Sequence, residues 1–184
     1  MPWLLPAQFD EGFGFESGSG NESISLTMIR SQVVFQVNSF EAYNEGLGDP
    51  FNHVIEFTVA SDVDFDVRFG VADFQNEYGD VIDPRNFGYR VESLGMHRTG
   101  SNFKFMGTGQ NPSRLVLMDE TREIISSHGQ GNAGSNMDNH FKITVQLGTK
   151  EVRDLSNLPP LVKQRIADGH YGGRVMITVL PEPW

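Results

Sequence analysis

Apolar and polar residues alternate along most of the chain, and this period of two predicts β-strands. The clearest case is HFKITVQL, in which every second residue from Phe141 to Leu147 is apolar. Similar segments separated by turn residues lie at 23–29, 32–38, 53–59, 61–70, 87–93, 114–118, 122–126, 140–147 and 173–180. About nine strands of this kind predict an all-β protein in which two antiparallel sheets pack as a sandwich.

One segment departs from the alternation and predicts a helix. LPPLVKQRIADG, residues 158–169, begins with prolines and places apolar Leu161, Val162 and Ile166 at helical spacing. Gly169 follows as a stop signal. We expect one short helix here, crossing between the sheets. Two long polar stretches are expected to be surface loops, residues 95–113 and 126–139.

The first residues form a separate unit. The segment ESGSGNES, residues 16–23, has the composition of a flexible joint. It divides the chain into an N-terminal extension, residues 1–22, and a sandwich domain, residues 23–184. Apart from Glu11, the odd positions of the extension are apolar from residue 3 onward: Trp3, Leu5, Ala7, Phe9, Phe13 and Phe15.

A strand with one apolar face is an aggregation hazard unless a sheet edge receives it. Two interpretations of the extension stay open. It inserts into another molecule as a donor strand, or it remains with its own domain, packed on it or partly disordered.

Composition and charge narrow the classes of function. The chain has 14 Lys and Arg residues against 24 Asp and Glu residues, a net charge of −10, which disfavours nucleic acid and anionic membrane surfaces as partners. No apolar run approaches the roughly 20 residues of a membrane-spanning helix. The chain has no cysteine, which excludes disulfides and a cysteine nucleophile. The first residues do not resemble a signal peptide, so export would require a leader already removed.

The segment SDVDFDVRFG, residues 61–70, resembles either a calcium loop or a strand. Counted from Asp62, a helix–loop–helix calcium site needs glycine at position six and glutamate at position twelve, where this chain has Val67 and Asp73. We therefore interpret the segment as a strand. The alternating residues then divide into a core face of Val63, Phe65, Val67 and Phe69 and a solvent face of Asp62, Asp64 and Asp66.

No other motif predicts chemistry. GQGNAG, residues 129–134, matches a dinucleotide-binding pattern, but a strand follows it where that pattern needs a helix, so we interpret it as a flexible loop. Asp138 and His140 lie two residues apart at the start of a predicted strand and are the candidate for a metal or acid–base pair. We expect no enzyme, no catalytic residues, no metal and no cofactor.

Three stretches together resemble a known family. They are VVFQVNSFEAYNEGL, IEFTVASDVDFDVRF and IADGHYGGRVMITVLP. Their order is similar to that in secreted immunoglobulin-like filament subunits, the chaperone–usher pilins and the spore-coat-U-like proteins. In these families the last strand begins at a G-x-Y turn, as at Gly169, His170 and Tyr171. The resemblance covers residues 23–181.

The resemblance implies an immunoglobulin-like antiparallel sandwich that lacks one strand, which the N-terminal extension of the next subunit supplies. The expected donor residues are Trp3, Leu5, Phe9, Phe13 and Phe15. It further implies a homopolymer at the cell surface or outside the cell, assembled with a periplasmic chaperone and an outer-membrane assembly protein. The chain departs from many pilins in having no disulfide. Pro2 and Pro6 cannot donate ladder hydrogen bonds, which would start the insertion after Pro6.

Two other functions stay open. One is a monomeric binding module whose loops hold a glycan or a protein, with Phe103 and Phe105 as the aromatic candidates. The other is an accessory or structural protein of a virion.

Overall fold

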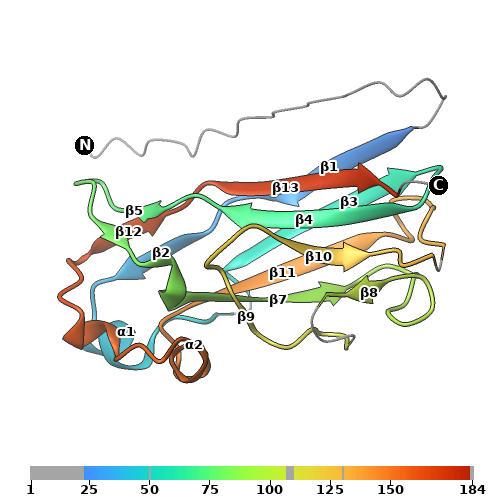
Figure 1. Ribbon diagram of the computed structural model, residues 1–184. Helices are drawn as coiled ribbons and strands as arrows, with labels where there is room; N and C mark the ends of the chain where they lie inside the picture. Colours follow the sequence, from blue (N-terminus) through green and yellow to red (C-terminus); the bar gives the residue numbers. More distant parts are fainter. Residues whose placement is uncertain (1–22, 50, 107–109, 130, 183–184) are drawn as a thin grey trace.

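The protein is an all-β sandwich of antiparallel sheets, as the alternation predicts (Figure 1). The computed structural model describes residues 23–49, 51–106, 110–129 and 131–182. In this part of the chain, no helix is long and apolar enough to cross a membrane.

The first sheet has five strands in the order β1-β3-β11-β7-β9. Its strands are β1 Ile24–Arg30, β3 Val54–Ser61, β11 His140–Leu147, β7 Phe87–Ser93 and β9 Val116–Leu117. Strand β11 lies in the middle of this sheet. Its odd-numbered residues, Phe141 to Leu147, are fully buried and the residues between them are half-buried.

The second sheet packs against the first and has the order β13-β4-β10-β8. Its strands are β13 Val175–Pro181, β4 Phe65–Val71, β10 Arg122–Ser126 and β8 Lys104–Phe105. A small third sheet in the order β2-β12-β5-β6 lies at the left-hand end of the molecule in Figure 1. It consists of β2 Val34–Val37, β12 Gly169–Gly172, β5 Phe74–Gln75 and β6 Val81–Ile82.

The two larger sheets have the strand order of a constant-type immunoglobulin domain. That domain pairs strands A, B, E and D in one sheet and C, F and G in the other. In chain order, β1, β3, β4, β7, β11 and β13 take the positions of strands A to F. The position of strand G, on the outer edge of β13, is not taken by any strand of the described residues.

Phenylalanine rings pack against one another in the core, beside valine, isoleucine and leucine side chains. Phe74 and Phe87 stack with ring centroids 3.9 Å apart, and the Phe141 ring contacts Phe57 at 5.5 Å and Phe103 at 5.3 Å. Such rings bury large apolar areas with defined geometry. Most phenylalanines of the described residues are thus core residues, although Phe40 and Phe51 are exposed.

The prediction of a helix over residues 158–169 is wrong. Only Leu161–Lys163 make a single 3₁₀ turn, η2, with Leu161 buried in the core, and the left-handed backbone of Arg165 (φ 57°) interrupts any helical continuation. The described residues instead contain two short α-helices, α1 Phe40–Glu45 and α2 Lys150–Ser156, and a 3₁₀ turn η1 Pro84–Asn86. The hydroxyls of Ser39 and Thr149 accept hydrogen bonds from the first turns of α1 and α2.

Candidate functional site

The candidate site is a line of core between the two sheets that no other described element covers, where the edge strands β1 and β13 lie side by side (Figure 1). Cα atoms of the two strands come within 8 Å of each other, but the strands belong to different sheets and do not pair. We call this surface the seam. It is formed by the inward-facing side chains of both strands, Ile24, Leu26 and Met28 of β1 and Val175, Ile177 and Val179 of β13.

The strand register shows that these side chains point into the sandwich. Residues directly opposite each other on paired strands point to the same face. Leu26 is opposite Val59, and Ile177 is opposite Phe69. Val59 and Phe69 are at most 1% exposed, whereas the seam side chains are only half-buried. Among the described residues, the core is therefore fully covered one strand inward from the seam and only partly covered at the seam itself.

The backbone of β13 offers a free hydrogen-bonding edge at the same residues. Arg174 O accepts from Ala72 N at 2.8 Å, and Glu182 N donates to Asp64 O at 2.8 Å. In an antiparallel pair the bonded positions alternate, so the even-numbered residues of β13 bond to β4. The N–H and C=O groups of Val175, Ile177 and Val179 then point outward, where no described strand receives them.

Strand β1 has the matching arrangement. Asp62 N donates to Ser23 O at 3.2 Å, so the odd-numbered residues of β1 bond to β3. Ile24, Leu26 and Met28 therefore present their backbone groups to the seam, as Val175, Ile177 and Val179 do from the other side.

Neither edge is protected by charge. Natural sheet edges usually carry lysine, inward-pointing charges or bulges that prevent further pairing. Residues 24–28 and 175–181 contain no charged residue. A bulge occurs only at the end of β1, between Met28 and Arg30. Pro181, which has no N–H, falls at an outward-pointing position, where an edge strand tolerates proline.

The expected donor residues cannot be placed. Trp3, Leu5, Phe9, Phe13 and Phe15 all lie outside the described residues. The seam that could receive them was not found by sequence reasoning. The alternation predicts strands over 23–29 and 173–180 but does not distinguish the seam residues from other core positions.

The aspartates of residues 61–70 have specific structural partners. Strand β4 begins at Phe65, so Asp62 and Asp64 lie in the turn after β3, and the strand interpretation is wrong for them. It is right for Phe65, Val67 and Phe69, which are buried. Each aspartate accepts a hydrogen bond from the backbone of a different segment: Asp62 from Ser23 (2.8 Å), Asp64 from Ala133 (3.0 Å) and Asp66 from Ser127 (3.1 Å).

The described residues contain no group of three or more His, Cys, Asp or Glu side chains arranged to hold a metal ion. Asp138 and His140 also have separate partners. Asp138 accepts from Ser135 Oγ at 2.7 Å, which lowers the pKa of its carboxyl. His140 Nε2 lies 2.7 Å from Glu56 Oε1 on the outer face of the first sheet. The two side chains thus form no acid–base pair.

The loop aromatics of the binding-module alternative are in the core. Phe103 is 0% exposed and Phe105 2% exposed, so neither can stack on a glycan. The polar stretch 95–113 therefore contributes two side chains to the core at the edge strand β8, and its interpretation as only a surface loop is wrong there.

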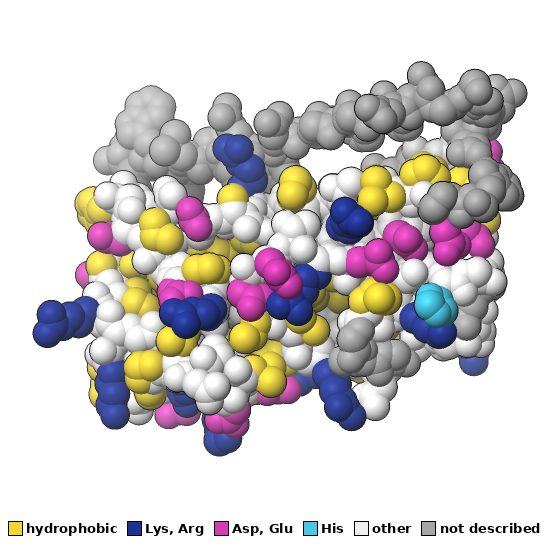
Figure 2. All heavy atoms as spheres, viewed as in Figure 1, with side chains coloured by type: hydrophobic (Ala, Val, Ile, Leu, Met, Phe, Trp, Pro, Cys, Tyr) yellow, Lys and Arg dark blue, Asp and Glu magenta, His cyan; other side chains and the backbone are white. Residues whose placement is uncertain are grey.

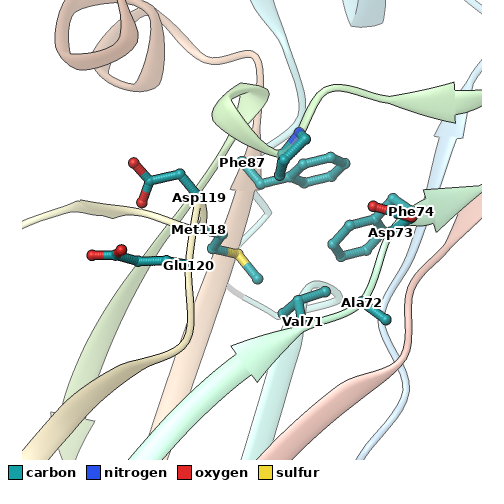
Figure 3. A pocket seen from close by; sticks show the side chains of 9 residues that line it. Val71, Ala72, Asp73, Phe74, Phe87, Met118, Asp119 and Glu120 are labelled. Carbon is teal, nitrogen blue, oxygen red and sulfur yellow. The ribbon is translucent and has the colours of Figure 1, made fainter.

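One shallow pocket of about 150 Å³ opens beside the end of β4 (Figure 3). Its apolar part includes Val71, Phe74, Phe87 and Met118, and Asp119 and Glu120 lie at its rim. Arg122 lies 2.9 Å from Asp119 and 3.0 Å from Glu120 and offsets their charge. Ligand pockets usually enclose about 300–1,000 Å³. This pocket is small, and no histidine or nucleophile lines it, so the seam remains the stronger candidate.

Comparison of the chain with protein-family models gives no match, and a search of the curated proteins gives none either. The candidate function therefore depends on the seam.

Proposed function

We propose that the protein is the structural subunit of a fibre or surface assembly outside the cell, and that it polymerises head-to-tail. In each joint, apolar residues of one subunit's N-terminal extension occupy the seam of the next subunit. The inserted strand pairs with the outer edge of β13, in the position of strand G. The observation that carries this proposal is the seam, where half-buried core side chains and outward backbone groups belong to the same six residues.

Strand addition at such an edge uses two kinds of interaction. Main-chain hydrogen bonds supply affinity, and pockets for alternate side chains supply specificity. Burial of each large apolar side chain contributes roughly 1.5–3 kcal/mol. Trp3, Leu5 and Phe9 together would then make a slowly dissociating joint. Because the donor and acceptor surfaces differ, the contact does not close on itself and builds a fibre.

The main alternative is that the extension covers its own seam. Ser23 and Glu182 both bond to the turn Asp62–Asp64, so the extension leaves the domain at the C-terminal end of β13. A segment that folds back directly from this point would cover the seam of its own domain and leave a monomer. If subunits assemble with one another, the proposal also includes a periplasmic chaperone and an outer-membrane assembly protein as partners. A monomer that covers its own seam would not need them.

Complementary variants separate these alternatives. A chain lacking residues 1–15 can accept a strand but cannot donate one. A full chain with Ile177→Glu can donate but cannot accept, because the charge lies in the seam. We expect each variant alone to be monomeric by light scattering, and their mixture to form 1:1 dimers. The control is Met176→Glu, which adds the same charge to the exposed face of β13 and should still polymerise.

If the full-length chain is monomeric, and the mixture of the two variants yields no dimer, polymerisation by strand insertion is wrong. If the full-length chain forms fibres that persist without residues 1–15, the joint lies elsewhere.

A further inference from the structure

Opposite charges stand at the two ends of β13. Arg174 precedes the strand and Glu182 follows it, and both occupy even positions, on the outer face of the sheet. Among the described residues, Arg174 forms no ion pair. Glu182 accepts a hydrogen bond from Ser127 Oγ, and its backbone N–H donates to the carbonyl of Asp64, in the turn before β4. Figure 2 shows acidic side chains gathered at the right-hand end of β4 and β13.

The acidic side chains here act on a neighbouring carboxyl. The pKa of Glu123 on β10 is raised by burial first and by the charge of Asp66 next; Arg68 and a hydrogen bond with Ser126 lower it, and the charge of Glu182 raises it by the smallest amount. A further carboxylate would therefore be disfavoured at this end of the strand and favoured at the Arg174 end.

The extension contains a segment that matches β13 in length. Residues 3–9, WLLPAQF, are seven residues with apolar side chains at the odd positions, and β13 also has seven. Asp10 follows at an even position. When the odd positions face the seam, Asp10 lies on the outer face of the sheet, the face that Arg174 and Glu182 share.

The direction of insertion decides which charge Asp10 meets. In an antiparallel strand with Phe9 opposite Val175 and Trp3 opposite Pro181, Asp10 is opposite Arg174. In a parallel strand with Trp3 beside Val175 and Phe9 beside Pro181, Asp10 lies beside Glu182. Opposite charges that face each other across a sheet are stabilising and like charges are destabilising.

We propose that Arg174 and Glu182 orient the inserted strand, so that residues 3–9 of a second copy run antiparallel to β13 with Asp10 opposite Arg174. This inference rests on the proposed strand insertion and adds its direction, register and orienting residues. The donor's domain then lies beyond the Arg174 end of the acceptor. If a chain inserted its own residues 3–9 in this direction, its residues 10–22 would have to run back along the whole length of the seam to reach Ser23.

The register also accommodates the prolines of the extension. An inserted strand paired with Val175, Ile177 and Val179 points the N–H groups of its odd residues at β13. Pro2 and Pro6 are at even positions, so they remove no bond to β13. Insertion therefore need not start after Pro6.

Engineered cysteines test the direction, because the chain has none of its own. Gln8 is opposite Met176 in the antiparallel register and beside Leu180 in the parallel one, and these positions leave the seam side chains intact. Full chains carrying Gln8→Cys are mixed with chains carrying Met176→Cys or Leu180→Cys and oxidised. We expect an interchain disulfide with Met176→Cys and at least severalfold less with Leu180→Cys.

Preferential linkage to Leu180→Cys, or equal linkage to both, overturns the direction while the insertion itself stands. If neither pair links although the complementary variants dimerise, the register is wrong. If those variants do not dimerise either, the proposed function fails with it.

A charge exchange tests the orienting residues. Arg174→Glu should weaken the joint about two- to fivefold, since like charges would face each other, and Asp10→Arg in the same chain should restore it. Lys163→Glu is the matched control, because Lys163 is exposed on η2, outside the seam, and makes the same change in net charge. Equal weakening by Arg174→Glu and Lys163→Glu, or no recovery in the double variant, overturns the role of Arg174.

Discussion

Replacement of Asn132 by alanine should destabilise the sandwich strongly, although Asn132 lies in the glycine-rich stretch GQGNAG. The side chain is 0% exposed. Its Oδ1 accepts from Phe65 N at 2.9 Å and its Nδ2 donates to Phe65 O at 2.8 Å. The amide thus takes the place of a neighbouring strand at the start of β4.

The expected magnitude follows from these two bonds. In the alanine variant, the buried N–H and C=O of Phe65 lose their partners, and each unsatisfied group costs about 1–3 kcal/mol. The loss is therefore about 2–6 kcal/mol, out of a total stability of about 5–15 kcal/mol. A loss of about 4 kcal/mol corresponds to a decrease in Tm of roughly 8–16 °C for a domain of this size.

Calorimetry and urea unfolding of Asn132→Ala measure the effect, with Asn102→Ala as the matched control. Asn102 also accepts from a backbone N–H, that of Arg98, and donates to a backbone carbonyl, that of Gly131, but it does so at the surface. Water replaces both bonds there, so the control should lose less than about 1 kcal/mol. A similar small loss in both variants would refute the buried-amide explanation.

Three further predictions follow from single sites. Gly95→Ala should destabilise the domain by about 1–3 kcal/mol, because an added Cβ would lie 2.2 Å from Asp138 O; Gly172→Ala, which meets no atom within 4 Å, should not show this loss in urea unfolding. Glu123→Gln should raise Tm at pH 7, because the raised pKa of Glu123 makes its charged form destabilising in the folded state. The gain in Tm should vanish below pH 4.5, the ordinary pKa of a glutamate. An equal gain in Tm at both pH values would contradict this account. The His53 imidazole should titrate below its ordinary pKa of 6.5 in NMR spectra, because burial against Phe35 lowers its pKa more than Asp49 raises it. The free energy of unfolding should then decrease as the pH falls through 6.5, because the unfolded chain binds the proton first. A titration at the ordinary pKa would contradict the buried, neutral ring.

Periodicity predicted the long strands because one face of each is buried. Strand β11 alternates in burial as it alternates in sequence, and so does β4 from Phe65 to Phe69. The two-residue strands β5, β6 and β8 are too short for a period to be visible, whereas β9 lies inside the predicted segment 114–118. Helices α1 and α2 were missed because they are short, although Ser39 and Thr149, each followed within two residues by a glutamate, were available as start signals.

The aspartates illustrate what a local pattern leaves undetermined. Asp62, Asp64 and Asp66 alternate with apolar residues, which is typical of a solvent-facing row. Their actual partners are the backbones at residues 23, 133 and 127, which are distant in the sequence. A local pattern indicates that a carboxylate faces away from the core, but not which loop it meets.

The seam depends on strand order in the same way. HFKITVQL and VMITVLP alternate equally well, yet Val145 of β11 is fully buried while Val179 of β13 is only half-buried. The difference is that β11 lies between β3 and β7, whereas β13 pairs with β4 alone in the described part of the chain. Periodicity reports the face of a strand and not the number of its neighbours, so the sequence could indicate an unpartnered donor but could not locate its acceptor. The flanking charges, which alternation ignores, are what distinguish β13 as an edge with a direction, because Arg174 and Glu182 make its two ends unequal.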